Sequence, residues 1–178
     1  HSFRCFYDSI VNNMFSISYK KDKYLLKIYK PFNYDLANFY FQILNLNKIP
    51  VATIGTLGVL SKRFKKKTYN TSIDPIKTHE YLNKLKRLNV NNIILEASSH
   101  GLKQSRLNYI NINTAIFTNL TRDHLDYHKT FKDYINSKLI LFENLLKKQG
   151  NIIYNYKSKY ANRLNKISKK SFWSYRKA

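Results

Sequence analysis

The chain has 178 residues, of which 43% are hydrophobic and 24% charged, which suffices for one domain with a buried core and excludes a disordered tail or a fibrous repeat. No apolar run approaches the ~18–20 residues of a membrane span. The single cysteine, Cys5, excludes a disulfide framework and a cysteine-built zinc site, which suits a protein of the reducing cytoplasm. The net charge of +22 predicts nonspecific, salt-sensitive binding to polyanions. Specific recognition of nucleic acids relies largely on arginine, whereas this Asn-, Ile- and Tyr-rich chain has 25 scattered Lys and only 7 Arg, so we expect no specific nucleic-acid partner.

In the first half of the chain, residues 1–30 show no clear helix or strand period, and the residues after them predict alternating helices and strands. In chain order, we expect no assignable element over 1–30, an amphipathic helix over 35–46, a buried strand over 50–54, a basic loop over 62–67 and a helix from Ser72 or Asp74 to Leu88. Pro75 stands in the first turn of this last helix, where its missing N–H does no harm.

The second half continues the alternation. We expect strands over 93–96, 114–118, 152–154 and 171–174, and helices over 131–146 and 158–167. Strands that alternate with helices predict an α/β fold with a mostly parallel sheet and helices on both faces. Ligands of such sheets bind at the carboxyl ends of the strands, where the pattern places Glu96 and Asn119.

Chemistry-bearing side chains gather in one segment. Three of the five histidines and four of the ten acids lie between Glu96 and Asp133. A carboxylate at a strand end, near an imidazole and hydroxyls, suits a hard cation such as Mg²⁺ and the phosphates that it bridges. The alternative is that Ser98, Ser99 and Asp123 are loop and capping residues and the histidines ordinary polar ones, which composition alone favours.

Several sequence segments carry a family resemblance. EASSHGLKQSRL over 96–107 is followed by AIFTNLTRDHLDYH over 115–128 and by a helix with Lys138, and ATIGTLG over 52–58 precedes them. From about Ala37 to its end, the chain resembles the central domain of Mur ligases, specifically of the UDP-N-acetylmuramoyl-tripeptide synthetase (MurE) type. The resemblance implies a P-loop-like α/β domain, of which this chain holds an incomplete copy.

The resemblance also implies a reaction of peptidoglycan synthesis, and thus a role in the cell wall, cell shape and cell division. The full-length enzyme would add an amino acid, diaminopimelate or lysine, to UDP-N-acetylmuramoyl-L-alanyl-D-glutamate. ATP is the co-substrate that makes an acyl phosphate, which the incoming amine attacks, and Mg²⁺ is the cofactor. The alternatives are a folylpolyglutamate synthase-like ligase and a nonenzymatic basic nucleic-acid-binding domain.

Three positions match the family's catalytic residues. The resemblance implies that Glu96 holds Mg²⁺ beside the γ-phosphate, that His124 binds a second Mg²⁺, and that Lys138 reacts with CO₂ to give a carbamate ligand of that metal. The positively charged ammonium of Lys138 would repel Mg²⁺, so the family's chemistry needs the negatively charged carbamate at this position. Lys138 could instead be a helix-surface lysine, but it falls on the apolar stripe of its helix, which favours a buried role.

Six further positions match the family's contacts with the UDP-muramoyl substrate: Asn70, Thr71, Ser72, Ser98, Gln104 and Arg106. A guanidinium can grip a phosphate or carboxylate with two bonds, which favours Arg106 on physical grounds. Thr71 and Ser72 could equally cap the following helix. We expect His100 and His128, which belong to the same motif, to be structural hydrogen-bonding residues.

The chain departs from the family at the ATP phosphate loop, which should read Gly-Thr-x-Gly-Lys-Thr/Ser directly before the first helix. The chain has Tyr29-Lys30-Pro31-Phe32-Asn33-Tyr34-Asp35 there, without a glycine and with a carboxylate at the phosphate position. We therefore expect the polypeptide alone to be inactive, with an aberrant segment over 1–35 and a partial central domain over 36–178. A shifted reading frame upstream of Leu36 and divergence to a noncatalytic protein both explain the break, and its abruptness favours the first.

The ends of the sequence suggest a piece of a longer protein. The chain starts at His1 without a signal-peptide pattern. The resemblance implies that the family's uridine-binding and amino-acid-binding domains lie outside these residues. We expect the full-length protein to be a cytoplasmic monomer.

Overall fold

The computed structural model describes the backbone of residues 4–6, 14–19, 22–27, 36–118, 120 and 124–170, with side chains for those of them between 36 and 167. Contacts along the chain divide it into two compact units, His1–Asp35 and Leu36–Ala178. The predicted strand over 171–174, the Tyr29–Asp35 segment and Asn119 lie outside the described residues.

The first unit contains a three-stranded antiparallel sheet. Its strands are β1 (Arg4–Phe6), β2 (Met14–Tyr19) and β3 (Asp22–Lys27). β2 is central, and its Ile17 lies opposite Cys5 on one side and Tyr24 on the other. No element is predicted here from the sequence, although residues 15–19 of β2 (FSISY) alternate strictly between apolar and polar side chains, a strand signal that the prediction missed.

The second unit contains a four-stranded sheet in the order β6-β5-β4-β7. Its strands are β4 (Val51–Gly55), β5 (Gly58–Ser61), β6 (Lys65–Lys66) and β7 (Asn92–Leu95). β4 and β7 are parallel, as predicted, whereas β5 and β6 are antiparallel additions, so the sheet is mixed. The prediction of a plain loop over 62–67 is wrong at β6, whose exposed lysines mark an edge strand.

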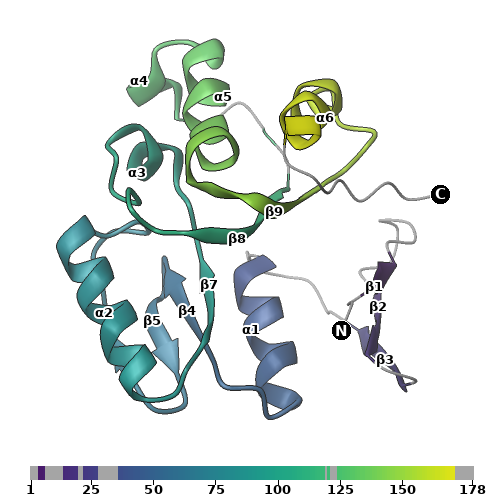
Figure 1. Cartoon of the computed structure of the whole chain (residues 1–178), viewed down its shortest axis with the longest axis vertical. Helices are drawn as coiled ribbons and strands as arrows, with labels where there is room; N and C mark the ends of the chain where they lie inside the picture. The colour runs from purple at the N-terminus through teal and green to yellow at the C-terminus, as the bar shows by residue number, and fades with distance from the viewer. Residues whose placement is uncertain are drawn as a thin grey trace. The chain divides into compact units, whose positions relative to one another are not determined.

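Two helices enclose this sheet. Helix α1 (Leu36–Leu46) packs along β4 and β7, and helix α2 (Pro75–Arg87) covers the other face (Figure 1). Asp74 caps α2 by accepting a hydrogen bond from the Lys77 N–H at 2.9 Å, which confirms one of the two predicted starts. The core under α2 joins buried residues of the strands and the helix: Ala52, Ile54, Val59, Ile73, Leu85 and Val90.

A second, two-stranded parallel sheet pairs β8 (Ile112–Phe117) with β9 (Leu146–Tyr154). Helix α5 (Phe131–Ile140), the π-helical turn η1 (Leu141–Leu145) and helix α6 (Ala161–Lys170) pack on it. They share one core: Ala115, Phe117, Ile135, Leu139, Phe142, Ile152 and Leu164. The helix predicted over 131–146 is confirmed to Leu145, with a change from α-helical to π-helical geometry at Leu141, and the strand predicted over 152–154 begins earlier, at Leu146.

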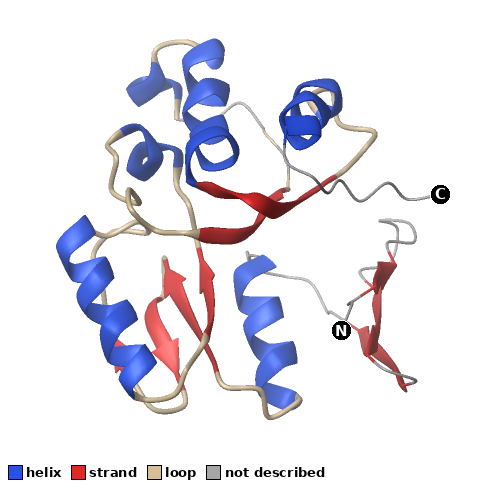
Figure 2. Cartoon of the chain, in the orientation of Figure 1, coloured by secondary structure: helices blue, strands red, loops and turns tan. Residues whose placement is uncertain are grey.

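Two short helices complete the unit: α3 (Ser99–Lys103) follows β7, and α4 (Leu125–His128) precedes α5 (Figure 2). Both are too short and polar to show a helical period in the sequence. The predicted α/β class with helices on both faces is confirmed, and the sheet is mixed rather than purely parallel. None of the helices in the described part of the chain combines the length and apolarity needed to cross a bilayer.

Candidate active site

The Glu96 carboxylate lies at the carboxyl ends of the two parallel strands. The Glu96 backbone N–H donates to the Ile54 carbonyl at 2.9 Å, which continues the pairing of β7 with β4. Its Oε2 accepts hydrogen bonds from the backbone N–H of Thr56 at 3.1 Å and from the Thr56 hydroxyl at 2.8 Å. A Cβ on Gly55 would lie 2.1 Å from Glu96 Oε1, so the carboxylate occupies the space that this glycine leaves.

A buried serine connects this carboxylate residue to helix α3. The Ser72 hydroxyl donates to the Glu96 carbonyl at 3.2 Å and accepts from the Ser98 N–H at 3.0 Å and the Ser98 hydroxyl at 3.0 Å. Ser98 in turn caps α3 by accepting from the Gly101 N–H at 3.1 Å. The capping role is thus confirmed for Ser98, whereas the prediction that Ser72 starts α2 is wrong, since Asp74 does so.

The other predicted substrate-contact residues make separate contacts, and only that of Arg106 reaches the serine pair. The half-buried Arg106 donates from Nη1 to the Ser72 carbonyl at 3.0 Å. Thr71 shares a hydrogen bond with Thr56, with 2.9 Å between the two hydroxyl oxygens. Gln104 is exposed and donates to the Tyr127 hydroxyl of α4 at 3.0 Å. Asn70 is exposed, and its carbonyl accepts from the Thr68 hydroxyl at 3.4 Å.

A second group of rings gathers where α3 meets α4 and α5. The His100 ring lies 4.0 Å from the Tyr127 ring and 5.1 Å from the His124 ring, measured between centroids. His124 also contacts Tyr134 at 5.9 Å, and Lys138 Nζ lies 5.5 Å from the Tyr134 centroid. Burial, and then the nearby His124, lower the pKa of His100. His124 and Lys138 therefore both contact the Tyr134 ring.

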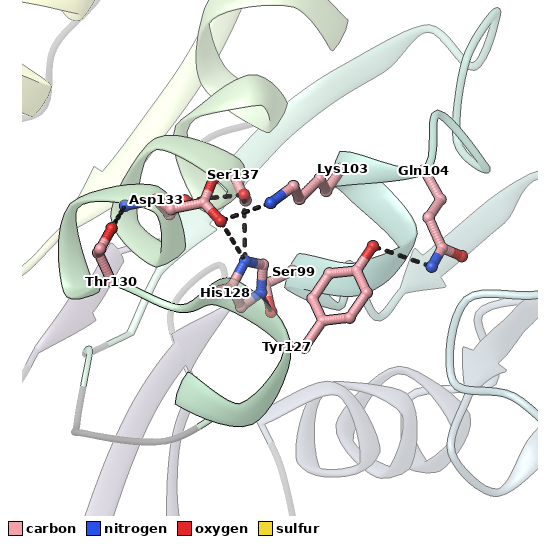
Figure 3. Close-up of polar contacts among 8 residues, drawn as sticks. All are labelled: Ser99, Lys103, Gln104, Tyr127, His128, Thr130, Asp133 and Ser137. Atoms are coloured by element: carbon pink, nitrogen blue, oxygen red, sulfur yellow. Dashed lines mark hydrogen bonds and ion pairs between the residues drawn. The ribbon is translucent and has the colours of Figure 1, made fainter.

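His128 forms a buried polar group with residues of α3 and α5 (Figure 3). Its Nε2 lies 2.9 Å from the Ser99 hydroxyl, and its Nδ1 lies 3.4 Å from the Ser137 hydroxyl and 3.5 Å from an Asp133 carboxylate oxygen. Lys103 makes an ion pair with the same carboxylate, which lowers the pKa of Asp133. His128 is confirmed as a structural hydrogen-bonding residue.

The described contacts thus arrange the predicted residues in two adjacent groups. Glu96, Ser72, Ser98 and Arg106 form one, and His124 with Lys138 belongs to the other; α3 joins them, since Ser98 caps it and His100 projects from it. Within the described residues, no cluster of three or more His, Cys, Asp or Glu side chains that could hold a metal is present.

Two residues that orient these groups were not identified from the sequence. Thr56 holds the Glu96 carboxylate, and its position directly after a strand, between two glycines, could have signalled a tight turn at the site. Tyr134 precedes Lys138 by four residues on α5, a spacing that places both on one face of the helix. The contact with Lys138 was therefore available from spacing alone.

Comparison with known proteins identifies the family of the chain. Residues 37–178 match the family model described as the Mur ligase middle domain. The chain is 42% identical over 110 residues to a UDP-N-acetylmuramoyl-L-alanyl-D-glutamate–2,6-diaminopimelate ligase of Wigglesworthia glossinidia brevipalpis, covering 62% of this chain and 22% of that protein. The ligase of the same name from Rickettsia bellii is 39% identical over 126 residues, covering 67% and 26%.

A solved structure shares the fold. A structure of UDP-N-acetylmuramoyl-L-alanyl-D-glutamate–2,6-diaminopimelate ligase superimposes with a TM-score of 0.64 at 30% identity, over 75% of this chain and 26% of that one. The chain thus spans about a quarter of the length of the relatives that it matches. Because the family model covers most of the chain, the protein belongs to the Mur ligase middle domain family.

Proposed function

We propose that this chain is the middle domain of a ligase that joins diaminopimelate to UDP-N-acetylmuramoyl-L-alanyl-D-glutamate in an ATP-dependent reaction. The observation that carries the proposal is the Glu96 carboxylate, fixed by Thr56 at the edge of the sheet beside Ser72 and Arg106, on a Mur ligase fold. Diaminopimelate is inferred from the names of the relatives. The complete reaction is proposed for a longer protein, because the chain spans about a quarter of those relatives.

Mg²⁺ fits the donors present at this edge. Mg²⁺ prefers oxygen ligands and is commonly held by one or two carboxylates together with water and substrate phosphates. The absence of a three-residue metal cluster among the described residues is compatible with that mode. Glu96 would hold one ion and His124 a second, with Lys138 as a further ligand. When bound, the ions neutralise the phosphate charge that develops during the reaction.

Lys138 suits carbamate formation in its surroundings. Its side chain is half-buried beside the Tyr134 ring, and its neighbours on α5 include the buried Tyr134, Ile135 and Leu139. The lysine ammonium first loses one proton, and the neutral nitrogen then bonds to the carbon of CO₂ and releases a second proton, so a cation becomes an anion with two oxygens. That change converts a group that repels Mg²⁺ into a ligand.

The substrate would bind through the group around Ser72. Arg106 already presents its guanidinium to a carbonyl oxygen, and a guanidinium has further N–H donors for a phosphate or carboxylate. Ser98, Thr71, Asn70 and Gln104 add hydroxyl and amide groups nearby. We propose a cytoplasmic, monomeric full-length enzyme without a specific nucleic-acid partner, and no ATP turnover by this chain alone, because its 29–35 segment lacks the glycines of a phosphate loop.

Carbamate formation on Lys138 tests the proposal directly. In ¹³C-labelled bicarbonate we expect one protein-bound carbamate signal by ¹³C NMR, because Lys138 alone among the family-matched positions carries an amine. Lys138→Ala should abolish the signal. Lys132→Ala, on an exposed residue of the same helix, is the matched control and should keep it. A signal that survives Lys138→Ala, or no signal at all, would contradict the assigned role.

The Thr56 contacts give a second test. Thr56→Val removes the hydroxyl that donates to Glu96 Oε2 but keeps nearly the same shape. Residues that orient a metal ligand typically contribute about 10–100-fold to metal affinity, and we expect a loss in that range for Mg²⁺. Amide chemical shifts near Glu96 during a MgCl₂ titration measure it. Thr68→Val is the control, since the Thr68 hydroxyl donates only to a carbonyl at 3.4 Å, and unchanged Mg²⁺ binding in Thr56→Val would count against Glu96 as a ligand.

A further inference from the structure

The buried group around His128 has no part in the function proposed above. It joins Ser99 of α3 to Asp133 and Ser137 of α5 through the imidazole of α4, while Lys103 of α3 pairs directly with Asp133 (Figure 3). His128 is 0% exposed and Ser99 2% exposed, so every link between Ser99, His128 and Ser137 is shielded from water. Such a satisfied polar group in a low-dielectric environment fixes a single arrangement of the elements that it joins.

The hydrogen-bond partners assign the protons in this group. The Ser137 hydroxyl donates to the Asp133 carbonyl at 2.8 Å, so it can only accept from His128, and the Asp133 carboxylate is also an acceptor. His128 Nδ1 therefore carries the hydrogen, and Nε2 accepts from the Ser99 hydroxyl. Burial lowers the pKa of His128, in keeping with a neutral ring.

The order Ser99, His128, Asp133 resembles the serine, histidine and carboxylate of hydrolases, but it does not serve that chemistry. A nucleophilic serine must reach a substrate carbonyl. Ser99 is only 2% exposed, and its hydroxyl faces the imidazole at 2.9 Å within the protein. The group therefore holds structure in place rather than reacting.

Both helices that it joins carry residues of the proposed site. Helix α3 begins at the Ser98 cap and leads into Gln104 and Arg106, and Ser137 on α5 directly precedes Lys138. We propose that His128 is a positioning residue that sets the substrate-contact residues after α3 against the carbamate lysine on α5. The effect on the site rests on the proposed function, whereas the coupling of the helices rests only on the contacts among α3, α4 and α5.

Three variants of His128 separate positioning from packing. His128→Asn places its side-chain amide near Nδ1, so it keeps a link to α5 and loses the link to Ser99, whereas His128→Gln reaches toward Ser99 and loses the link to α5. His128→Phe fills the space without either link. A packing role predicts that phenylalanine is tolerated best, and a positioning role predicts that all three variants uncouple the helices.

Hydrogen exchange measures the coupling without any ligand. Ser137→Ala on α5 should accelerate exchange of the α3 amides, among them Gln104 N–H, by about threefold or more in the chain with His128. The same change should have no effect on α3 in His128→Phe. An equal acceleration in both backgrounds would overturn the proposal. If His128→Phe does not fold, Ser99→Ala replaces it, because this also removes the link from the imidazole to α3.

A second arm adds UDP-N-acetylmuramoyl-L-alanyl-D-glutamate and follows amide shifts. In the unchanged chain we expect shifts on both α3 and α5, and in His128→Asn and His128→Gln on α3 alone. Shifts on α5 that persist in both variants would overturn the positioning role. If no amide shifts in the unchanged chain, this chain alone does not bind the proposed substrate, and the exchange experiment still decides whether His128 couples the helices.

Discussion

Gly101→Ala should reduce the free energy of unfolding by about 2–4 kcal/mol, combining overpacking with displaced hydrogen bonds. A Cβ at this position would lie 2.3 Å from Ser72 Cβ, 2.6 Å from Ser72 Oγ and 3.0 Å from Ser98 Oγ. Ser72 is 1% exposed and makes three hydrogen bonds, so it cannot move without breaking them. The higher helix propensity of alanine than of glycine offsets only about 1 kcal/mol of this loss in the free energy of unfolding.

Urea denaturation of Gly101→Ala, Ser72→Gly and the double variant measures this effect. Ser72→Gly is destabilising by itself, because the Glu96 carbonyl and the Ser98 N–H lose their partner. It also removes the two closest atoms that the new methyl group would meet and leaves only Ser98 Oγ at 3.0 Å, so adding Gly101→Ala to it should cost much less than in the unchanged chain. Strictly additive effects, or a stable Gly101→Ala, would show that the contact between α3 and Ser72 is looser than the distances indicate.

Local signals in the sequence predict the elements whose ends are set by local chemistry. Asp74 before Pro75 fixes the start of α2, and the apolar run after Pro50 fixes β4. The end of the helical segment after α5 is different, because Leu146 fits a helical stripe and a strand equally well, and the structure places it in β9. Pairing of β9 with β8 decides between them, and periodicity does not report that pairing.

The site shows the same division between local and tertiary signals. Glu96 could be placed at the sheet edge because parallel strands align their carboxyl ends. The role of Ser72 depends on hydrogen bonds to residues 24 and 26 positions away, and that of His128 on Ser99, 29 positions away. Such contacts arise only after the sheets and helices have packed, so the sequence predicted the residue types and not their partners.

Gly55 and Gly58, three residues apart at the turn between β4 and β5, should respond to alanine in opposite ways. The three atoms nearest to a Gly55 Cβ would all belong to the Glu96 side chain, with Oε1 at 2.1 Å, Cδ at 2.2 Å and Cγ at 2.7 Å. This flexible side chain can turn away, so Gly55→Ala should fold with a loss of about 1–2 kcal/mol from the Thr56 hydrogen bonds. The carboxylate would then leave the sheet edge, and Mg²⁺ affinity should fall at least about tenfold.

Gly58→Ala is the matched control. Gly58 has a φ of +88°, and its Cβ would lie 2.3 Å from the Lys66 carbonyl oxygen, which is backbone and part of β6. Left-handed strain and the clash together should cost about 2–5 kcal/mol, while the folded fraction keeps the Glu96 contacts and binds Mg²⁺ normally. Urea denaturation and the MgCl₂ titration on both variants separate the two effects. If Gly55→Ala binds Mg²⁺ like the unchanged chain, the position of the Glu96 carboxylate does not determine metal binding, because this substitution displaces that group while the fold survives.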